Sequence, residues 1–286
     1  MPSQKAHAVR DTGLGVIRHP DRTNWIRQAS AEDGLERIEA FFDGKGYEMH
    51  RHDTYAIGLT LSGVQSFHYR GEVRHGLAGG ALVLHPDEKH DGQAGTEGGF
   101  HYRMLYIEPA LIQAALRGRA LPFVEGGLSA DGRLMSAMAR LLAGLDRALD
   151  PLEREDAVYD LALALAAASK GGATKAPRII DHRSAEIARS FLHSRPATVD
   201  LATLERLTGR DRWSLSRDFR SLFGTSPYRY LVLRRLDDAR ALMRAGSAPA
   251  DAAIMAGFAD QSHMTRQFKS AYGLTPSQWL RLHARP

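Results

Sequence analysis

The chain contains no cysteine. It can therefore form neither a disulfide nor a thiolate metal site, and this composition favours a reducing compartment. Long apolar stretches are also missing. The N-terminus lacks the apolar core of a signal peptide, and the most apolar run, Leu161–Ala168, is too short to cross a bilayer. We therefore expect a cytoplasmic protein that makes no membrane contact.

Charge is unevenly distributed along the chain. Residues 177–286 contain 18 Lys and Arg against 10 Asp and Glu, a net charge of +8. Residues 1–176 contain the remaining 20 basic and 23 acidic residues, a net charge of −3. Nearly all basic residues of the second part are arginines, whose guanidinium groups suit phosphates and guanine edges. A basic excess confined to one part favours a polyanionic partner over a uniformly solvated surface.

Local patterns divide the chain into four segments. Residues 1–20 lack apolar periodicity and are predicted to form an N-terminal arm. Residues 21–169 begin with short runs of aromatic and branched residues between glycine turns, which is typical of a β-barrel or sandwich. Residues 170–182 open with the linker-like stretch KGGATKAP. Residues 183–286 are predicted to be helical.

Two leucine-rich amphipathic helices, 131–149 and 151–169, are expected at the end of the second segment. They carry more leucine than one barrel flank needs. Part of this apolar surface is predicted to cover the barrel, and part to form a seam between two copies of the chain. We therefore expect a homodimer.

The helical segment contains a duplicated stretch. Residues 215–231 (LSRDFRSLFGTSPYRYL) align with residues 264–280 (MTRQFKSAYGLTPSQWL) at an offset of 49. The shared skeleton is Leu/Met-Ser/Thr-Arg-x-Phe-Arg/Lys-Ser-x-Phe/Tyr-Gly-x-Ser/Thr-Pro, and a short helical stretch precedes each copy. A duplication this detailed predicts two copies of one structural unit.

Each copy predicts an amphipathic helix. Leu215 and Phe219 mark the apolar face of the first, Met264 and Phe268 that of the second, and the opposite faces are polar and cationic. A short helix, a tight turn and such a second helix form a helix-turn-helix unit, whose second helix enters the major groove of DNA. The Gly-x-Ser/Thr-Pro ending predicts a helix C-cap and the start of another helix.

An uninterrupted amphipathic helix is predicted between the copies, at residues 228–246. A helix of about 18 residues spans about 27 Å, which is comparable with the roughly 34 Å turn of B-DNA. Such a spacer would hold the two units over successive major grooves on one side of the duplex.

Residues 257–276 (GFADQSHMTRQFKSAYGLTP) closely match the signature of the AraC/XylS family of transcription regulators, and the resemblance covers about residues 180–282. It implies a multi-domain α+β protein. A cupin-like β-barrel with two flanking helices would precede an all-α domain in which a long helix joins two helix-turn-helix motifs. The resemblance further implies a sequence-specific activator that binds duplex DNA and contacts RNA polymerase. We expect no enzymatic activity and no cofactor.

The resemblance also assigns roles to single residues. Positions that commonly face bases in the family are occupied here by Trp213, Ser216, Arg217, Gln261, Ser262 and Arg266. Of these, the two arginines are candidate guanine readers, because arginine can bridge O6 and N7. Phosphate contacts, which fix register rather than sequence, are expected from Arg212, Arg220 and Lys269. Two alternatives stay open: Trp213 could cover the helix pair, and each polar residue could act by general electrostatic attraction.

Histidines mark the expected barrel. His50 and His52, in HRHDTYAIGLTLSG, resemble the H-x-H of a cupin, and His90 ends a second cupin-like element, GALVLHPDEKH. The glutamate that usually completes a cupin metal site is absent from residues 54–58. We therefore expect no bound metal, although three histidines suffice chemically for zinc or iron. The other interpretations are packed or exposed histidines, and histidines that hydrogen-bond a ligand.

A small-molecule effector is expected to enter the barrel mouth. Its pocket is predicted to be lined by His50, His52, Tyr55, His68, His90, Tyr102 and Tyr106. Along residues 100–107 alternate side chains face opposite sides, and the sequence does not decide which set lines the interior. Effector binding would bias, through the linker, where the C-terminal domains can sit on DNA.

Two enzyme classes compete with the regulator interpretation. A cupin-type metalloenzyme with an appended DNA-binding module remains the alternative. A DNA-repair or methyl-transfer enzyme with the same helix pair is excluded, because such proteins need reactive cysteines and the chain has none.

Overall fold

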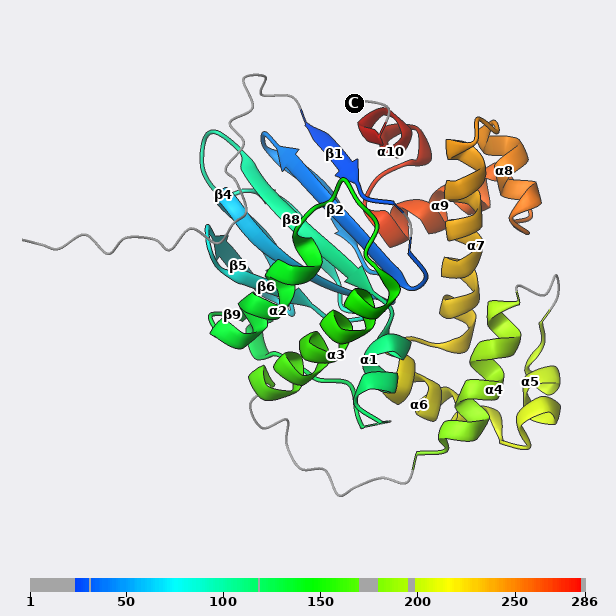
Figure 1. Ribbon diagram of the computed structural model, residues 1–286. Helices are drawn as coiled ribbons and strands as arrows, with labels where there is room; N and C mark the ends of the chain where they lie inside the picture. The colour runs from blue at the N-terminus through cyan, green and yellow to red at the C-terminus, as the bar shows by residue number, and fades with distance from the viewer. Residues whose placement is uncertain (1–23, 31, 118, 170–179, 195–198, 284–286) are drawn as a thin grey trace, which may run out of the picture.

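The computed structural model describes residues 24–30, 32–117, 119–169, 180–194 and 199–283. The predicted N-terminal arm and most of the predicted linker lie outside these residues. Figure 1 shows a sheet-rich N-terminal half packed beside a helical C-terminal half. The predicted fold class, a barrel domain followed by an all-α domain, is confirmed.

The N-terminal half is built on strands that pair antiparallel to one another. In the described residues they are β1 (Trp25–Gln28), β2 (Leu35–Phe42), β3 (Lys45–His50), β4 (Tyr55–Tyr69), β5 (Glu72–Leu77), β6 (Ala81–Leu84), β7 (His90–Ala94), β8 (Phe100–Ile107) and β9 (Leu128–Ser129). One path of neighbours runs β1-β2-β8-β4-β6-β9, and β3, β5 and β7 join it through β4. Strand β4 pairs with β6 and β8 along its first part and with β5 and β7 along its second part. It therefore belongs to both layers of the barrel.

Two separate cores flank the sheet. Tyr102 and Met104 of β8 point into the barrel interior, whereas Leu105 and Ile107 pack on the outer face. The structure thus decides which set of residues 100–107 lines the interior. The alternation places apolar side chains on both faces, so the sheet needs a cover on the outside as well.

Helices cover the outer face of the sheet, as Figure 1 shows. They are α1 (Pro109–Ala115), α2 (Gly132–Leu142) and α3 (Pro151–Ala168). The two predicted flanking helices are present, but α2 ends before residue 149, because Ala143 is extended and Gly144 takes a positive φ of 58°. Helix α3 begins with a capping box between Asp150 and Glu153.

The C-terminal half is helical throughout its described residues. It contains α4 (His182–His193), α5 (Leu201–Thr208), α6 (Arg212–Phe223), α7 (Pro227–Arg244), α8 (Pro249–Met255), α9 (Gln261–Tyr272) and α10 (Pro276–His283). Helices α5 and α6 form the first helix-turn-helix unit and α8 and α9 the second. Helix α7, of 18 residues, joins the units as predicted.

The same local chemistry begins and ends the two repeated helices. The side chain of Asp211 accepts backbone hydrogen bonds at the start of α6, and that of Asp260 does so at the start of α9. Both helices end at a glycine with positive φ, 72° at Gly224 and 68° at Gly273. Among the helices of the described segments, none has the length and apolarity that a membrane crossing requires.

Candidate functional site

Helix α6 presents its predicted DNA contacts to solvent. Arg212, Arg217 and Arg220 are exposed, and Ser216 is partly exposed. Trp213 is 67% exposed, with the Arg212 guanidinium 5.4 Å above its ring, so it does not cover the helix pair. Arg220 donates to the Ser216 hydroxyl oxygen at 2.5 Å. The exposed face therefore combines cations, a hydroxyl group and a flat aromatic surface.

Helix α9 presents the matching face of the second unit. Gln261, Ser262 and Arg266 are exposed, while Phe268 on the opposite side is fully buried. Lys269 differs from the other predicted phosphate contacts because its ammonium lies 2.6 Å from a carboxylate oxygen of Glu48 in β3. One predicted DNA contact is thus engaged by the barrel.

The barrel touches the C-terminal ends of both α6 and α9. A side-chain carbon at Gly224 would lie 2.3 Å from Pro86, and one at Gly273 would lie 2.6 Å from the Glu48 carbonyl oxygen. The Glu48 N–H donates to the Gly273 carbonyl at 3.2 Å, and the Arg51 N–H donates to the Ser270 carbonyl at 3.1 Å. Only glycine permits these two approaches.

Helix α7 is fixed to the barrel by Arg229, Arg234 and Arg240, which we call the arginine ladder. Arg234 contacts Asp53 at 3.2 Å and also pairs with Glu108. The other two guanidinium groups bind further barrel oxygens: Arg240 lies 2.7 Å and 2.9 Å from the two carboxylate oxygens of Glu36, and Arg229 donates to the Arg51 carbonyl at 2.5 Å.

The carboxylates facing this ladder are electrostatically perturbed. Burial raises the pKa of Asp53 to about 6, although Arg234 opposes the shift. Burial alone would also raise the pKa of Glu36, but the Arg240 guanidinium holds it below its usual value. Glu36 is therefore ionised at neutral pH, and Arg240 is its charge partner.

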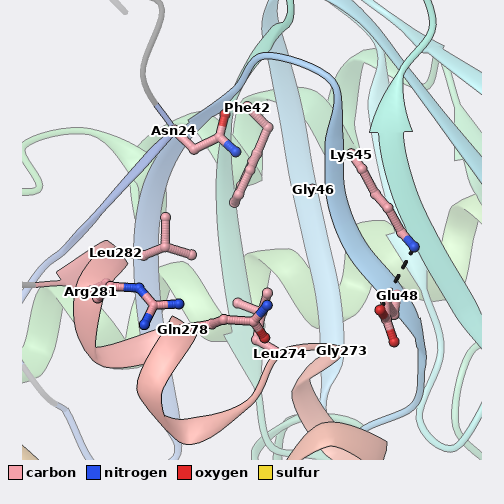
Figure 2. A pocket seen from close by; sticks show the side chains of 10 residues that line it. All are labelled: Asn24, Phe42, Lys45, Gly46, Glu48, Gly273, Leu274, Gln278, Arg281 and Leu282. Atoms are coloured by element: carbon pink, nitrogen blue, oxygen red, sulfur yellow. Dashed lines mark ion pairs between the residues drawn. The ribbon is translucent and has the colours of Figure 1, made fainter.

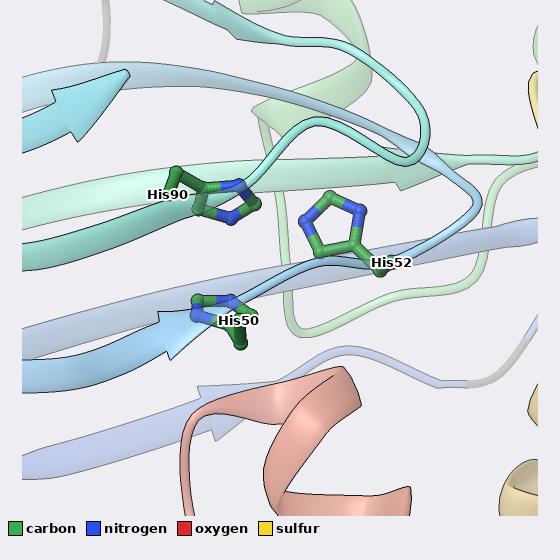
Figure 3. Close-up of side chains that lie close together, drawn as sticks. All are labelled: His50, His52 and His90. Carbon is green, nitrogen blue, oxygen red and sulfur yellow. The ribbon is translucent and has the colours of Figure 1, made fainter. Parts of the chain in front are cut away.

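The barrel mouth lies directly beneath this junction. His50, His52 and His90 are buried with their rings gathered around one point, as Figure 3 shows. The ring centroids of His50 and His90 are 4.3 Å apart, and the ring of Tyr106 lies 5.4 Å from that of His52. Tyr102, deeper in the barrel, hydrogen-bonds the hydroxyl of Tyr47. Five of the predicted pocket residues are therefore brought together: His50, His52, His90, Tyr102 and Tyr106.

Tyr55 and His68 lie elsewhere, contrary to our prediction. Tyr55 packs in the outer core beneath the covering helices. His68 is half exposed on the outside of the barrel, with its Nδ1 2.8 Å from the Asp91 carboxylate. For His68 the cause is a bulge: the pairing of β4 with β8 shifts between Thr60 and Ser62, so the inward-facing positions change from even to odd numbers beyond it.

Hollows lie between the barrel and the C-terminal half. A cleft of about 320 Å³ is lined by His52, Asp53 and Tyr106 from the barrel and by Arg234 and Arg240 from α7. A second hollow, of about 570 Å³, lies between the β2–β3 hairpin and the α9–α10 segment. Figure 2 shows its polar lining: Asn24, Lys45, Glu48, Gln278 and Arg281. Both hollows join residues that are far apart in the sequence.

Both halves of the chain match known protein families. Residues 34–162 match the AraC-like ligand binding domain, and residues 204–282 match a helix-turn-helix domain. The chain is 27% identical to the HTH-type transcriptional regulator YbfI of Bacillus subtilis over 237 residues, which cover 79% of this chain and 86% of YbfI. It is 30% identical to the probable transcription factor PqrA of Proteus vulgaris over 82 residues, which cover 28% of this chain and 67% of PqrA.

A solved structure shares the whole fold. ToxT from Vibrio cholerae O395 superposes with a TM-score of 0.61 at 14% identity, covering 88% of this chain and 98% of ToxT. The matched ligand-binding domain, the matched helix-turn-helix domain and the regulator relatives confirm the prediction of a DNA-binding transcription regulator with an N-terminal ligand-binding domain. The chain therefore belongs to the AraC/XylS family of DNA-binding transcription regulators, with an N-terminal ligand-binding domain and a C-terminal helix-turn-helix domain.

Proposed function

We propose that a small molecule bound in the cleft between the barrel mouth and α7 controls how α6 and α9 meet DNA. The observation that carries this proposal is the contact of one barrel with the ends of both helices, at Gly224 and Gly273. A ligand that binds one arrangement of these contacts better than another shifts the population of arrangements. Its binding is thereby coupled to DNA binding.

The lining of the cleft indicates the chemistry of the ligand. Arg234 and Arg240 supply cationic groups, and Tyr106 and Tyr272 supply aromatic surface. One structure of ToxT from Vibrio cholerae contains an unsaturated fatty acid. For the present chain we propose an apolar molecule with a carboxylate, which would compete with Glu36 for Arg240. Displacing that ion pair would loosen the arginine ladder.

We propose that the two units read successive major grooves. Base contacts come from Trp213, Ser216 and Arg217 in the first unit and from Gln261, Ser262 and Arg266 in the second. Phosphate contacts come from Arg212, Arg220 and Lys269. Supporting this assignment, the residues lie on the exposed side of α6 and α9, opposite the buried faces. The Glu48–Lys269 ion pair makes the last of these contacts dependent on barrel docking.

We further propose a homodimer, a cytoplasmic location and the domain limits 21–169 and 183–286. The outward side of α3 exposes Leu152, Tyr159 and Leu163, which lie on one helical face. Such an apolar strip fits a second copy of the chain. The family resemblance supports activation through contact with RNA polymerase and a role without catalysis.

The DNA assignment is tested by comparing two arginines. We expect Arg266→Ala to weaken binding to a sequence selected from a random duplex library by about 5- to 150-fold, because a bidentate base contact contributes about 1–3 kcal/mol. Affinity for random duplex should change little. The matched control, Arg220→Ala, should weaken both duplexes equally and lower the salt slope by about one. Identical behaviour of the two variants in fluorescence anisotropy titrations would contradict the assigned roles.

The ligand assignment is tested with oleate below its critical micelle concentration. Oleate should raise the thermal unfolding midpoint of the full chain, since a ligand at 100 times its Kd stabilises the folded state by about 2.7 kcal/mol. Oleyl alcohol has the same chain without the carboxylate and serves as the control. Equal stabilisation by both molecules, or by neither, would rule out carboxylate recognition by the ladder.

A further inference from the structure

The imidazole rings of three buried histidines meet at the barrel mouth, and the described cluster contains no carboxylate. His50, His52 and His90 each offer one ring nitrogen, and these nitrogens lie within 4.8 Å of one another. Burial lowers the pKa of all three, and the other rings of the cluster lower those of His50 and His52 further. The pKa of His90 falls to about 4. The neutral imidazole is the form that binds metals.

Hydrogen bonds fix which nitrogen carries the proton. Nδ1 of His50 lies 2.8 Å from the Glu48 carbonyl, and Nδ1 of His90 lies 2.9 Å from the Glu88 carbonyl. Nδ1 of His52 likewise lies 2.9 Å from a backbone carbonyl. A carbonyl only accepts, so each Nδ1 donates and each Nε2 keeps its lone pair. Ligating histidines in metal sites are oriented by the same kind of bond.

One of these lone pairs has no partner. The Nε2 of His52 is buried and accepts no hydrogen bond within the described structure. A buried polar atom without a partner costs about 1–3 kcal/mol, so the His52 Nε2 carries that cost. The Nε2 atoms of His50 and His90 supply the other two lone pairs of the cluster. A bound cation would satisfy all three at once.

We propose that His50, His52 and His90 bind one divalent transition-metal ion, of the zinc or iron(II) class, through their three Nε2 atoms. Three imidazoles without thiolate or carboxylate suit these ions and leave a further coordination position open. Our expectation of no metal rested on the missing glutamate, but the three-histidine set is sufficient without it. The proposal concerns the barrel's own side chains and does not depend on the proposed effector.

The site is connected to the second helix-turn-helix unit. Glu48 accepts the His50 Nδ1–H through its carbonyl, donates its own N–H to Gly273, and pairs with Lys269 through its side chain. A side-chain carbon at Gly273 would lie 2.9 Å from the His50 Nδ1. A metal that fixes His50 therefore also fixes the segment of β3 on which α9 docks.

The test uses the untagged full chain, stripped with a chelator and titrated with Co²⁺ as a visible probe and then with Zn²⁺. We expect saturable uptake of one equivalent, d–d absorption from Co²⁺, displacement of that signal by Zn²⁺, and a higher unfolding midpoint. His52→Gln removes one of the proposed metal ligands. It should lower the metal affinity by more than the roughly 10- to 100-fold that is lost when a residue orienting a ligand is removed. His68→Gln, on the outside of the barrel, should bind as the wild type does.

The wild-type titration alone can overturn the proposal. Absence of saturable one-to-one uptake refutes it, whether or not the variants fold. So does uptake by His52→Gln with wild-type affinity. Substoichiometric binding that His68→Gln removes would place the ion on the outer surface and would also refute the proposal.

Discussion

Arg240→Met is expected to release α9 from the barrel while both domains stay folded. The Arg240 side chain is 12% exposed and bonds both oxygens of Glu36, whose pKa it holds down. Removing one partner of a fully buried ion pair costs about 3–5 kcal/mol, because the remaining charge is left uncompensated. The Glu36 side chain is 26% exposed, so this range is the upper limit for Arg240→Met. Separation of the domains returns Glu36 to water and relieves this cost. Undocking is therefore the favoured response to the substitution.

Two backbone amides report this event directly. The N–H groups of Glu48 and Arg51 donate to carbonyls of the α9 region, at Gly273 and Ser270, so their protection from hydrogen exchange depends on docking. A loss of 3–5 kcal/mol corresponds to exchange that is faster by about two to four orders of magnitude. Amides in the barrel core should keep their protection. Hydrogen exchange read out by NMR or by mass spectrometry of a β3 peptide makes the measurement.

Two further variants separate this mechanism from general destabilisation. Arg235→Met removes a partly exposed arginine of the same helix, which bonds the Gly257 carbonyl within the C-terminal half, and should leave the two amides protected. The double variant Glu36→Leu with Arg240→Met should recover docking, because an apolar pair can replace a buried ion pair without loss. If the Glu48 and Arg51 amides of Arg240→Met exchange as slowly as those of the wild type, the ladder does not hold the domains together.

The helix-turn-helix units could be predicted from the sequence because their information is local. Caps, helical periodicity and the glycine–proline ending all lie within the repeated stretch, and α6 and α9 begin 49 residues apart, at Arg212 and Gln261, as the alignment requires. Helix caps are formed by residues that are neighbours in the sequence, so they do not depend on the rest of the fold. The long helix between them was predictable for the same reason.

The arginine ladder was not predictable, because its partners are remote in the sequence. Arg240 and Glu36 are 204 residues apart, and Arg234 and Glu108 are 126 apart. Helical periodicity shows which residues share a face of α7 but not what that face meets. Arginines next to an apolar stripe look the same from the sequence whether they face solvent or a second domain.

Part of the effector-pocket prediction failed because the alternation of inward-facing and outward-facing residues is interrupted within β4. A period of two assigns alternate residues to opposite faces, but one bulge in β4 reverses the assignment for everything beyond it. His68 therefore points outward. For Tyr55 the failure has another source, because the sequence could not tell the inner core from the outer one. The three clustered histidines follow the cupin-like spacing and were correctly grouped.

Phe219→Ala and Phe268→Ala are expected to disable the two DNA-reading units one at a time. The residues occupy equivalent positions of the repeat, and both are fully buried. Phe219 packs against Phe223, with ring centroids 4.7 Å apart, and Phe268 packs against Tyr272 at 4.6 Å. Truncating a buried phenylalanine to alanine costs about 3–5 kcal/mol. That cost is a large share of the stability of a small helical unit.

The two cores are separate, which is why the losses should be separable. Phe219 belongs to a cluster formed by α4, α5, α6 and the start of α7, whereas Phe268 belongs to one formed by α7, α8, α9 and α10. Hydroxyl-radical footprinting on a selected duplex should show that each variant loses protection over one groove and keeps the neighbouring one. Phe219→Leu and Phe268→Leu, which retain most of the buried volume, should keep both. If either alanine variant loses both grooves, α7 transmits unfolding from one core to the other, and the two units are one cooperative domain rather than two independent readers on a rigid spacer.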